Sequence, residues 1–342
     1  MSCDTSAFRK PSRHWLQVWS GCRLDLLIMP NSDQTNTVGV AQGQDSLNQV
    51  SLASFTRYRS LLFSLAYRML GTVADAEDML QEAFIRWQAA SREDIRSPKA
   101  FLITIVTRLC IDQLNSSRAR REEYVGQWLA EPVVTDTASN PFELVQTDES
   151  LSMAFLVLLE RLTPDERAVF LLREIFDYDY SEIAKVIDQS EANCRQILRR
   201  AKQHVSAPRS RFSAPRRKRE KLRREFLEAA GNGNLAGLIG LLSADVTLHT
   251  DGGGKGGALP NVIHGSSKVA RAVLSGLGRV PPTNAFISMA QINGEAGFII
   301  YINEQPQFVF ILHASTEHIQ SIYVVTNPDK LSHLPPAEAA PR

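Results

Sequence analysis

The sequence predicts a multidomain protein in which two all-helical domains precede a smaller α+β domain. Three observations support this. Apolar residues recur at helical spacing through residues 55–205, and two helices near residue 190 are separated by only three residues. From residue 285 the pattern changes to apolar alternation with a period of two, which is typical of strands. A chain of 342 residues is long enough for two or three domains of ordinary size.

Charge is segregated along the chain, although the formal net charge is only +1. From Arg195 to Arg224 there are thirteen Lys and Arg residues and a single acid, Glu220, whereas 74–94 is rich in acids. Segregation of this kind indicates two surfaces that serve two different partners.

No cofactor or metal site is predicted. The four cysteines (Cys3, Cys22, Cys110 and Cys194) lack the spacing of metal ligands, and two of them fall on apolar helical positions. We therefore expect reduced core residues of a cytoplasmic protein. No apolar run approaches the roughly 20 residues of a membrane span, so no membrane partner is expected.

The N-terminal residues 1–48 lack periodicity and are expected to form a disordered tail. The stretch Trp15–Met29 is interrupted by polar and charged residues, which makes it a poor signal peptide. Both Met1 and Met29 remain open as the start of translation.

Residues 49–121 form the first helical domain, with three helices expected within Phe55–Ser116. The middle helix has one apolar stripe, which includes Leu80 and Trp87, and exposes Asp78, Gln81 and Glu82 on the opposite face. The third helix is expected to begin with Ser97 as its cap and Pro98 at its first position, and it ends in a basic cluster that contains Arg118 and Arg120.

Residues 122–146 are predicted to form a linker, since they contain Pro132, Pro141 and several small polar residues. Within it, Trp128-Leu129-Ala130-Glu131-Pro132 is unexpectedly apolar. We expect this segment to pack on a neighbouring domain.

The second helical domain, 147–206, contains the signature of a helix-turn-helix. Thr163-Pro164-Asp165-Glu166 is a capping box, and the helices Ser181–Ile187 and Glu191–Val205 flank a three-residue turn in which Asp188 stands where glycine is common. The second helix has a basic outer face formed by Arg195, Gln196, Arg199 and Arg200, opposite its apolar stripe. This face is either a base-reading surface or simply a solvated cationic face.

After a basic linker at 207–221, residues 222–334 are predicted to form the α+β domain, and 335–342 a tail. The dipeptide Asn293-Gly294 is a strong hairpin signal. A helix-covered meander implies a cone with a hollow. The ionisable side chains available there are His249, Asp251, His264, Tyr301 and His313, but they form no clear acid–base pair, so no enzyme is predicted.

The order of these motifs resembles the sigma-70 family of transcription-initiation factors. Ala76-Glu77-Asp78-Met79-Leu80-Gln81-Glu82 resembles region 2 of that family, and Asp177–Val205 resembles region 4. The absence of other sigma domains is typical of the extracytoplasmic-function group. The linker segment and two C-terminal segments, 251–255 and 327–331, resemble the subgroup with a fused SnoaL-like (NTF2-like) domain.

The resemblance implies RNA polymerase core and promoter DNA as partners. Asp78, Gln81 and Glu82 would contact the β′ clamp helices, and region 4 would bind the β flap. Thr104 and Arg108 would face the opened −10 strand, with the loop Arg92–Ser97 completing a pocket for an extruded base. The basic cluster Arg118 and Arg120 would also contact DNA. The helix-turn-helix would read the −35 element.

The resemblance also implies that the C-terminal domain regulates the helical domains in cis. Three segments would form or border the contact between linker and cone, and their residues are Trp128, Leu129, Glu131, Pro132; Asp251, Gly252, Gly253, Gly254, Lys255; and Asn327, Pro328, Asp329, Lys330, Leu331. The rival interpretation is a one-component, ligand-responsive helix-turn-helix regulator. A small ligand in the cone, of unknown identity, is compatible with either.

Overall fold

The computed structural model describes residues 38–90, 95–122, 124, 126–135, 151–205, 215–254, 258–280, 284–315 and 317–334. The chain divides into two compact units at Ser46, and the second, Leu47–Arg342, contains both helical domains and the sheet.

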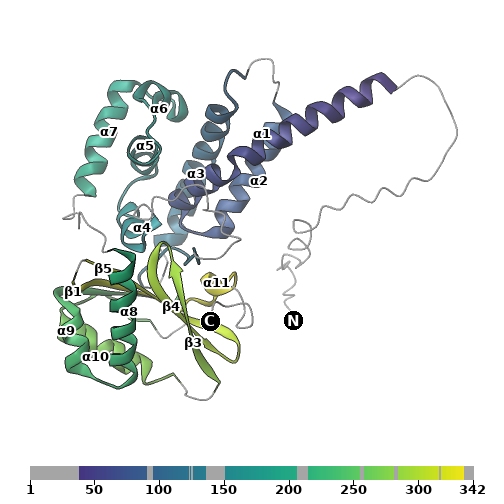
Figure 1. Ribbon diagram of the computed structural model, residues 1–342. Helices are drawn as coiled ribbons and strands as arrows, with labels where there is room; N and C mark the ends of the chain where they lie inside the picture. Colours follow the sequence, from purple (N-terminus) through teal and green to yellow (C-terminus); the bar gives the residue numbers. More distant parts are fainter. Residues whose placement is uncertain are drawn as a thin grey trace, which may run out of the picture. The chain divides into compact units, whose positions relative to one another are not determined.

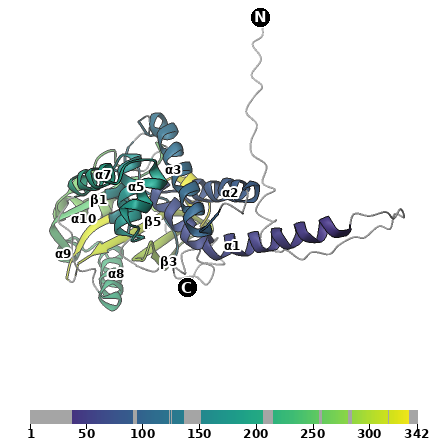
Figure 2. The ribbon, with the colours of Figure 1, turned by 90° about the horizontal axis from the view of Figure 1, so that it is seen from above.

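The first helical domain consists of three helices, as expected: α1 (Val38–Leu70), α2 (Val73–Ala89) and α3 (Pro98–Glu122) (Figure 1 and Figure 2). Thr72 caps α2 by accepting a hydrogen bond from the amide of Asp75. The expectation of an unstructured tail up to residue 48 is wrong from Val38 onward, because α1 already begins there. Once a helix has nucleated, each further residue adds one hydrogen bond, and no proline lies between Val38 and Phe55 to stop it.

The second helical domain contains α4 (Met153–Leu159), α5 (Pro164–Glu174), α6 (Tyr180–Ile187) and α7 (Glu191–His204). The capping box at the start of α5 is confirmed, since Thr163 and Glu166 exchange hydrogen bonds between side chain and backbone. Asp188 adopts the left-handed conformation, with φ +54°, between α6 and α7. It therefore fills the turn position that glycine often occupies.

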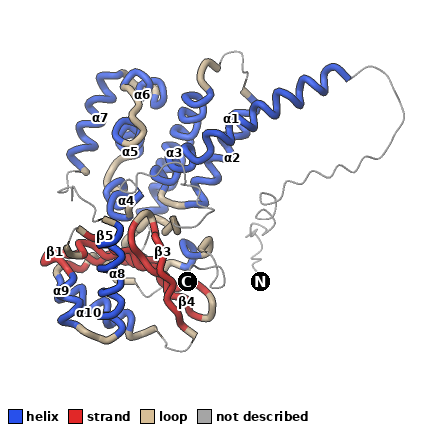
Figure 3. Tube along the Cα trace, in the orientation of Figure 1, coloured by secondary structure: helices blue, strands red, loops and turns tan. Residues whose placement is uncertain are grey.

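The C-terminal domain is α+β (Figure 1 and Figure 3). Its helices are α8 (Arg216–Gly231), α9 (Leu235–Leu241), α10 (Ser266–Leu277) and α11 (Pro328–Leu331). Its strands are β1 (Leu242–Asp251), β2 (Ile263–His264), β3 (Ala285–Ile292), β4 (Glu295–Ile302), β5 (Gln305–Ala314) and β6 (Ile319–Val325). The basic segment 207–221 was expected to be a linker, but it is helical from Arg216, because Leu222 and Phe226 bury a helical stripe that the preceding residues extend.

The strands form one sheet in the order β2-β1-β6-β5-β4-β3. Neighbouring strands are antiparallel, except that β1 and β6 run parallel. Asn293 and Gly294 form the predicted hairpin turn between β3 and β4, both with positive φ. β3 ends the sheet, and its last residue, Ile292, also pairs with Val134 of the linker.

The two faces of this sheet contribute to two different hydrophobic cores. One face packs against α8, α9 and α10 and buries Phe226, Phe298 and Phe310 among them. The opposite face, with Ile299, Ile311 and other residues one position out of phase, joins the core of the helical domains. The period-two geometry of a strand assigns alternate residues to the two faces.

Part of the linker is tightly packed at Gly71, between α1 and α2. Gly71 has φ +78°, and a Cβ atom at this position would lie 2.2 Å from the indole of Trp128. Only glycine therefore allows both the backbone conformation and the close approach of the ring.

We expect Gly71→Ala to destabilise the protein more than Gly126→Ala. Both substitutions force alanine into a positive φ, but a Cβ at Gly126 would meet nothing within 4 Å. The backbone cost of about 1–2 kcal/mol is common to both, and Gly71→Ala adds an overpacking cost of about 1–3 kcal/mol. Urea midpoints followed by tryptophan fluorescence measure the difference, and equal midpoints for the two variants would contradict it.

Candidate nucleic-acid interface

The basic face predicted on α7 is exposed. The helix buries Cys194, Ile197, Leu198 and Ala201 against α5 and α6. Its solvent side carries Arg195, Gln196, Arg199 and Arg200, all exposed. The arrangement suits a helix that reads a major groove, because long side chains with hydrogen-bond donors project from one side of the helix while the other side is fixed by packing.

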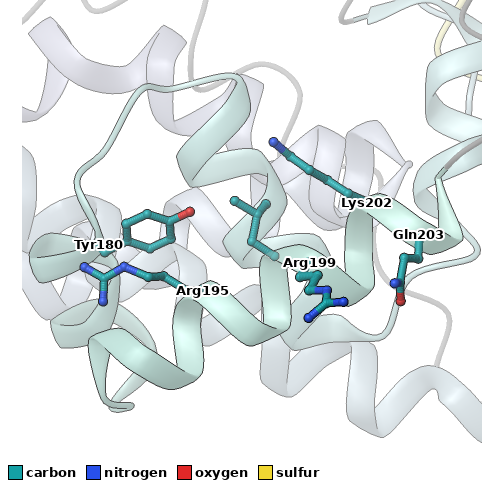
Figure 4. A pocket seen from close by; sticks show the side chains of 6 residues that line it. Tyr180, Arg195, Arg199, Lys202 and Gln203 are labelled. Atoms are coloured by element: carbon teal, nitrogen blue, oxygen red, sulfur yellow. The ribbon is translucent and has the colours of Figure 1, made fainter.

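Arg195 is held in place on this face by two neighbours. Its guanidinium pairs with Glu191 at 2.9 Å and lies 4.8 Å from the centre of the Tyr180 ring. Arg173 lies over the same ring at 5.1 Å. Figure 4 shows Tyr180 beside Arg195, at one end of a groove of about 390 Å³ lined by Tyr180, Arg195, Leu198, Arg199, Lys202 and Gln203.

Tyr180 is a residue that the sequence reasoning missed. It is the first residue of α6, directly after the capping Asp179, and so stands at the start of the first helix of the helix-turn-helix. An aromatic residue at that position, near the basic face of the second helix, was an available signal.

The acidic face predicted on α2 is also exposed. Asp78 and Gln81 are exposed, and the half-buried Glu82 pairs with Arg86 one turn away at 2.8 Å. Partial burial raises the pKa of Asp78, and the nearby Asp75 raises it further. The same face carries Ile85, an apolar side chain that is 59% exposed. Ile85 follows Gln81 by four residues, so the sequence spacing could have identified it.

The side chains predicted to face the −10 strand lie on α3. Thr104 donates a hydrogen bond to the carbonyl of Ala100 in its own helix. Arg108 instead donates to two carbonyls at the C-terminus of α6, those of Val186 at 2.8 Å and Lys185 at 3.0 Å. A cation at a helix C-terminus satisfies carbonyls that have no partner within the helix. Arg108 therefore joins the first helical domain to the helix-turn-helix.

Some predicted DNA-contacting groups lie outside the described residues. These are residues 91–94 of the pocket loop and the side chains of Arg118 and Arg120.

A second contact between the helical domains lies deeper in the core. Arg167 of α5 is buried and donates to the carbonyl of Met69 in α1 at 2.6 Å, while it pairs with Glu160 at 2.8 Å. Arg68 lies over the ring of Phe176 at 5.8 Å.

The linker meets the C-terminal domain at Asp251, the last residue of β1. Its carboxylate is fully buried and accepts hydrogen bonds from the amide of Leu129 at 2.9 Å and from Lys330 at 2.8 Å. Lys330 also donates to the carbonyl of Leu129, at 2.5 Å. The hydroxyl of Tyr124 donates to the other carboxylate oxygen at 2.5 Å. One ion pair therefore holds both the N–H and the C=O of Leu129.

The residues around this ion pair come from all three predicted segments. Lys330 lies 4.0 Å from the centre of the Trp128 ring, a cation–π contact. Asn327 caps α11 and donates to the hydroxyl of Tyr124. A Cβ at Gly253 would lie 2.6 Å from the Asn327 side chain. Leu331 is buried, Pro328 and Asp329 are exposed, and Lys255 lies outside the described residues.

Glu131 and Pro132 extend the same contact toward the first helical domain. The Glu131 carboxylate accepts the amide of Val73 at 2.6 Å, and its backbone carbonyl accepts the hydroxyl of Tyr67 at 2.6 Å. His333 contacts the Glu131 carboxylate at 2.5 Å and the carbonyl of Pro132 at 2.8 Å.

Asn293 completes the chain of contacts from the hairpin turn of the C-terminal domain. Its side chain accepts the amide of Val133 and donates to the hydroxyl of Tyr67 at 2.7 Å. Four residues of this network, Tyr67, Tyr124, Asn293 and His333, were not predicted. Only Asn293 had a sequence signal, and that signal indicated the turn alone.

The acid–base candidates do not line a hollow under the helices. His249, Asp251, Tyr301 and His313 project from the sheet face opposite α8–α10, because they are out of phase with Leu248, Ile300 and Leu312 of the helix-covered core. The expectation that they line the hollow is therefore wrong. His264, on β2, is exposed.

Each candidate on this face has a structural partner. His249 contacts Gln127 of the linker at 3.0 Å and stacks on Tyr323, and burial lowers its pKa to about 4. His313 pairs with the buried Glu295, which also accepts the amide of Met153 in α4. Among the described residues, no group of three or more His, Cys, Asp and Glu side chains is arranged to hold a metal ion. Within the same part of the chain, no helix is both long and apolar enough to cross a membrane.

We expect Asp251→Asn to destabilise the protein by about 3–5 kcal/mol, because it leaves the buried Lys330 without its counter-charge. The matched control is Asp245→Asn, an exposed position on the same strand, which should change stability by less than about 0.5 kcal/mol. The double variant Asp251→Asn, Lys330→Met should recover part of the loss. Chemical denaturation measures all three, and a harmless Asp251→Asn would contradict the assignment.

Comparison with known proteins places these observations in a family. Residues 55–120 match the model of sigma-70 region 2, and residues 152–205 match that of sigma-70 region 4. The chain is 39% identical over 251 residues to the ECF RNA polymerase sigma factor SigJ of Mycobacterium tuberculosis, which covers 72% of this chain and 80% of that protein. It is 32% identical to the probable ECF sigma factor SigI of the same species over 82% of this chain and 95% of the relative. The crystal structure of M. tuberculosis SigJ superposes with a TM-score of 0.68 at 33% identity, covering 82% of this chain and 98% of that one.

Proposed function

Because this chain belongs to the extracytoplasmic-function group of the sigma-70 family, we propose that its C-terminal domain controls promoter-specific initiation in cis through the linker. As a sigma factor it has RNA polymerase core and promoter DNA as partners, and its C-terminal domain is α+β. The observation that supports the proposal is that the Asp251–Lys330 pair binds the main chain of Leu129. Asp251 accepts a hydrogen bond from the Leu129 amide, and Lys330 donates one to the Leu129 carbonyl. The rival one-component regulator finds no support, since the relatives are sigma factors.

We propose that the exposed face of α2 binds the clamp helices of the polymerase β′ subunit. Asp78, Gln81 and Glu82 supply polar and acidic groups, and Ile85 supplies an apolar side chain at the same face. Interfaces commonly combine a desolvated apolar anchor with a polar rim. The other face of α2 is fixed in the core by Leu80 and Trp87.

Replacing Asp78, Gln81, Glu82 and Ile85 together by Ala should weaken core polymerase binding by about tenfold or more, since loss of an interface anchor commonly costs over 1 kcal/mol. The control is Asp112→Ala, an exposed acid on α3. Titration of labelled protein with core polymerase measures the affinities, and circular dichroism verifies the fold. Unchanged affinity would remove α2 from the polymerase interface.

We propose that α7 reads the −35 element and that α3 faces the −10 strand. The supporting feature of α7 is its exposed basic face, where Arg195 is already oriented by Glu191 and Tyr180. Such preorganisation reduces the entropy that a bidentate contact to a base would cost. The region 4 helix-turn-helix is also the part we assign to the polymerase β flap.

Arg195→Ala or Arg199→Ala should each cost about 1–3 kcal/mol in promoter recognition if the side chain contacts a base edge. The loss of binding affinity should appear with the native −35 sequence and not with a scrambled one. Promoter binding by the holoenzyme, measured with both sequences, tests this. Wild-type discrimination in both variants would show that α7 does not read the −35 element.

The contacts that Arg108 and the linker make within the chain support an inhibited resting state of the sigma factor. Arg108, which we propose contacts the −10 strand, here donates hydrogen bonds to two backbone carbonyls of α6. The C-terminal domain holds the linker on the first helical domain through Glu131, His333 and Asn293. A domain that binds one arrangement of the helical domains better than another shifts the equilibrium toward it. We assign the domain no catalytic role and no ligand.

His333→Ala should raise initiation, because it removes contacts between the end of the C-terminal domain and the linker at Glu131 and Pro132, while the Glu131 carboxylate keeps the amide of Val73. A coupling free energy of 1–3 kcal/mol corresponds to a change of roughly 5- to 150-fold. The control is His318→Ala, an exposed histidine of the same domain. Transcription in vitro with core polymerase measures the output. Equal output from wild type and His333→Ala would argue against control through this contact.

A further inference from the structure

The N-terminal half of α8 carries many positively charged side chains, and most of them take no part in packing the helix on the sheet. From Arg216 to Arg224 there are seven Arg and Lys residues and one acid, Glu220. Leu222 and Phe226 anchor the helix in the core. Arg223 faces the sheet and donates to the carbonyls of Ala290 and Gly297.

Four of the other six cations lie on one exposed stripe. Arg217, Lys221 and Arg224 follow the i, i+4, i+7 spacing of a single helix face, and Lys218 lies beside them. Within the described part of the chain, Arg217, Lys218 and Arg224 have no acidic partner. Lys221 is 3.6 Å from Glu225 and remains exposed. The stripe spans about 10 Å along the helix axis.

This charge is placed where it opposes helix stability. The first turn of α8 contains no acid, and Pro215 at the N-cap provides no side-chain hydrogen bond. Cations at a helix N-terminus are repelled by the positive end of the helix dipole, whereas an anion there is attracted. Local rules that a sequence breaks without a structural gain commonly mark functional sites.

The chemistry of the stripe favours the sugar-phosphate backbone of a nucleic acid as its binding partner, rather than a protein or a membrane. It lacks the aromatic or aliphatic anchor that protein interfaces use. A helix that lies in a membrane surface inserts its apolar face, but the apolar face of α8 is buried against the sheet. Duplex DNA presents one negative charge about every 1.7 Å along its axis, so a 10 Å stripe can meet several phosphates.

We propose that the Arg217–Arg224 stripe of α8 binds the phosphate backbone of duplex DNA without regard to sequence. The C-terminal domain then adds to the DNA contacts of the helix-turn-helix. Eleven residues separate the end of α7 from the start of α8, enough to span up to roughly 36–40 Å when extended. The inference rests on the proposed function in one respect, since it takes promoter DNA to be bound at α7. In Figure 2, α8 lies at the margin of the C-terminal domain.

The test compares two triple variants of the full-length protein. Arg217→Gln, Lys218→Gln and Arg224→Gln together neutralise the stripe. Lys268→Gln, Arg271→Gln and Arg279→Gln remove the same charge from exposed positions elsewhere in the same domain. Fluorescence anisotropy measures binding to a native promoter duplex and a scrambled duplex across a series of salt concentrations, and circular dichroism verifies both folds.

The stripe variant should lose affinity for both duplexes by the same factor, on the order of tenfold or more near 0.1 M salt. Its plot of log affinity against log salt should be shallower by about 0.9 per lost phosphate contact. The control variant should bind like wild type. Equal losses of DNA affinity in the two variants would show that the effect comes from net charge alone, and this would overturn the proposal. A stripe variant with unchanged DNA affinity would overturn it as well.

Two further measurements test a membrane role for the stripe and the proposed function itself. If the stripe variant loses binding to phosphatidylserine vesicles but not to duplex DNA, the stripe is a membrane contact and the proposal fails. Transcription with core polymerase tests the proposed function independently. A stripe variant that binds DNA unchanged, while His333→Ala still raises initiation, would overturn only the inference. Equal initiation by wild-type protein and His333→Ala, while the stripe variant loses DNA affinity, would overturn only the proposed function.

Discussion

A buried carboxylate, Asp251, is the constraint on which the contact between linker and C-terminal domain depends. A charge removed from water is tolerated only when it is paired and its remaining lone pairs are satisfied. Lys330, the amide of Leu129 and the hydroxyl of Tyr124 meet both requirements. These donors come from α11 and from the linker, so the β1 strand cannot bury this residue unless both segments are in place.

The sheet contributes to two cores, because alternate residues of each strand lie on opposite faces. One face is covered by α8, α9 and α10. The other face belongs to a core that it shares with the linker and the helical domains. Hydrogen bonds from Tyr67 to Glu131 and from Asn293 to Tyr67 continue the contact from α1 to the β3–β4 turn. A contiguous network of packed and hydrogen-bonded groups is a physical route by which one domain can influence another.

Charge is arranged on separate surfaces that suit separate partners. The acidic face of α2 and the basic face of α7 lie on different domains, each on a helix whose apolar stripe is buried. Arg108 is the exception, since its charge is used inside the molecule, at the carbonyl end of α6. The contact with DNA that we propose for Arg108 would compete with this contact, and the two arrangements would then differ in their affinity for DNA.

The sequence by itself determined the order of the domains, most of the helices and the exposed faces of α2 and α7. Those features follow from local periodicity and capping, which depend on residues a few positions apart, as at Thr163 and Glu166. It also indicated that Trp128 and Leu129 pack on another domain. Only the tertiary structure decided which partners meet there, and it placed Arg108 on α6, His249 beside Gln127 and Lys330 on Leu129. Those pairs join residues tens to hundreds of positions apart, and a single sequence holds no local signal for a contact that exists only once the chain has folded.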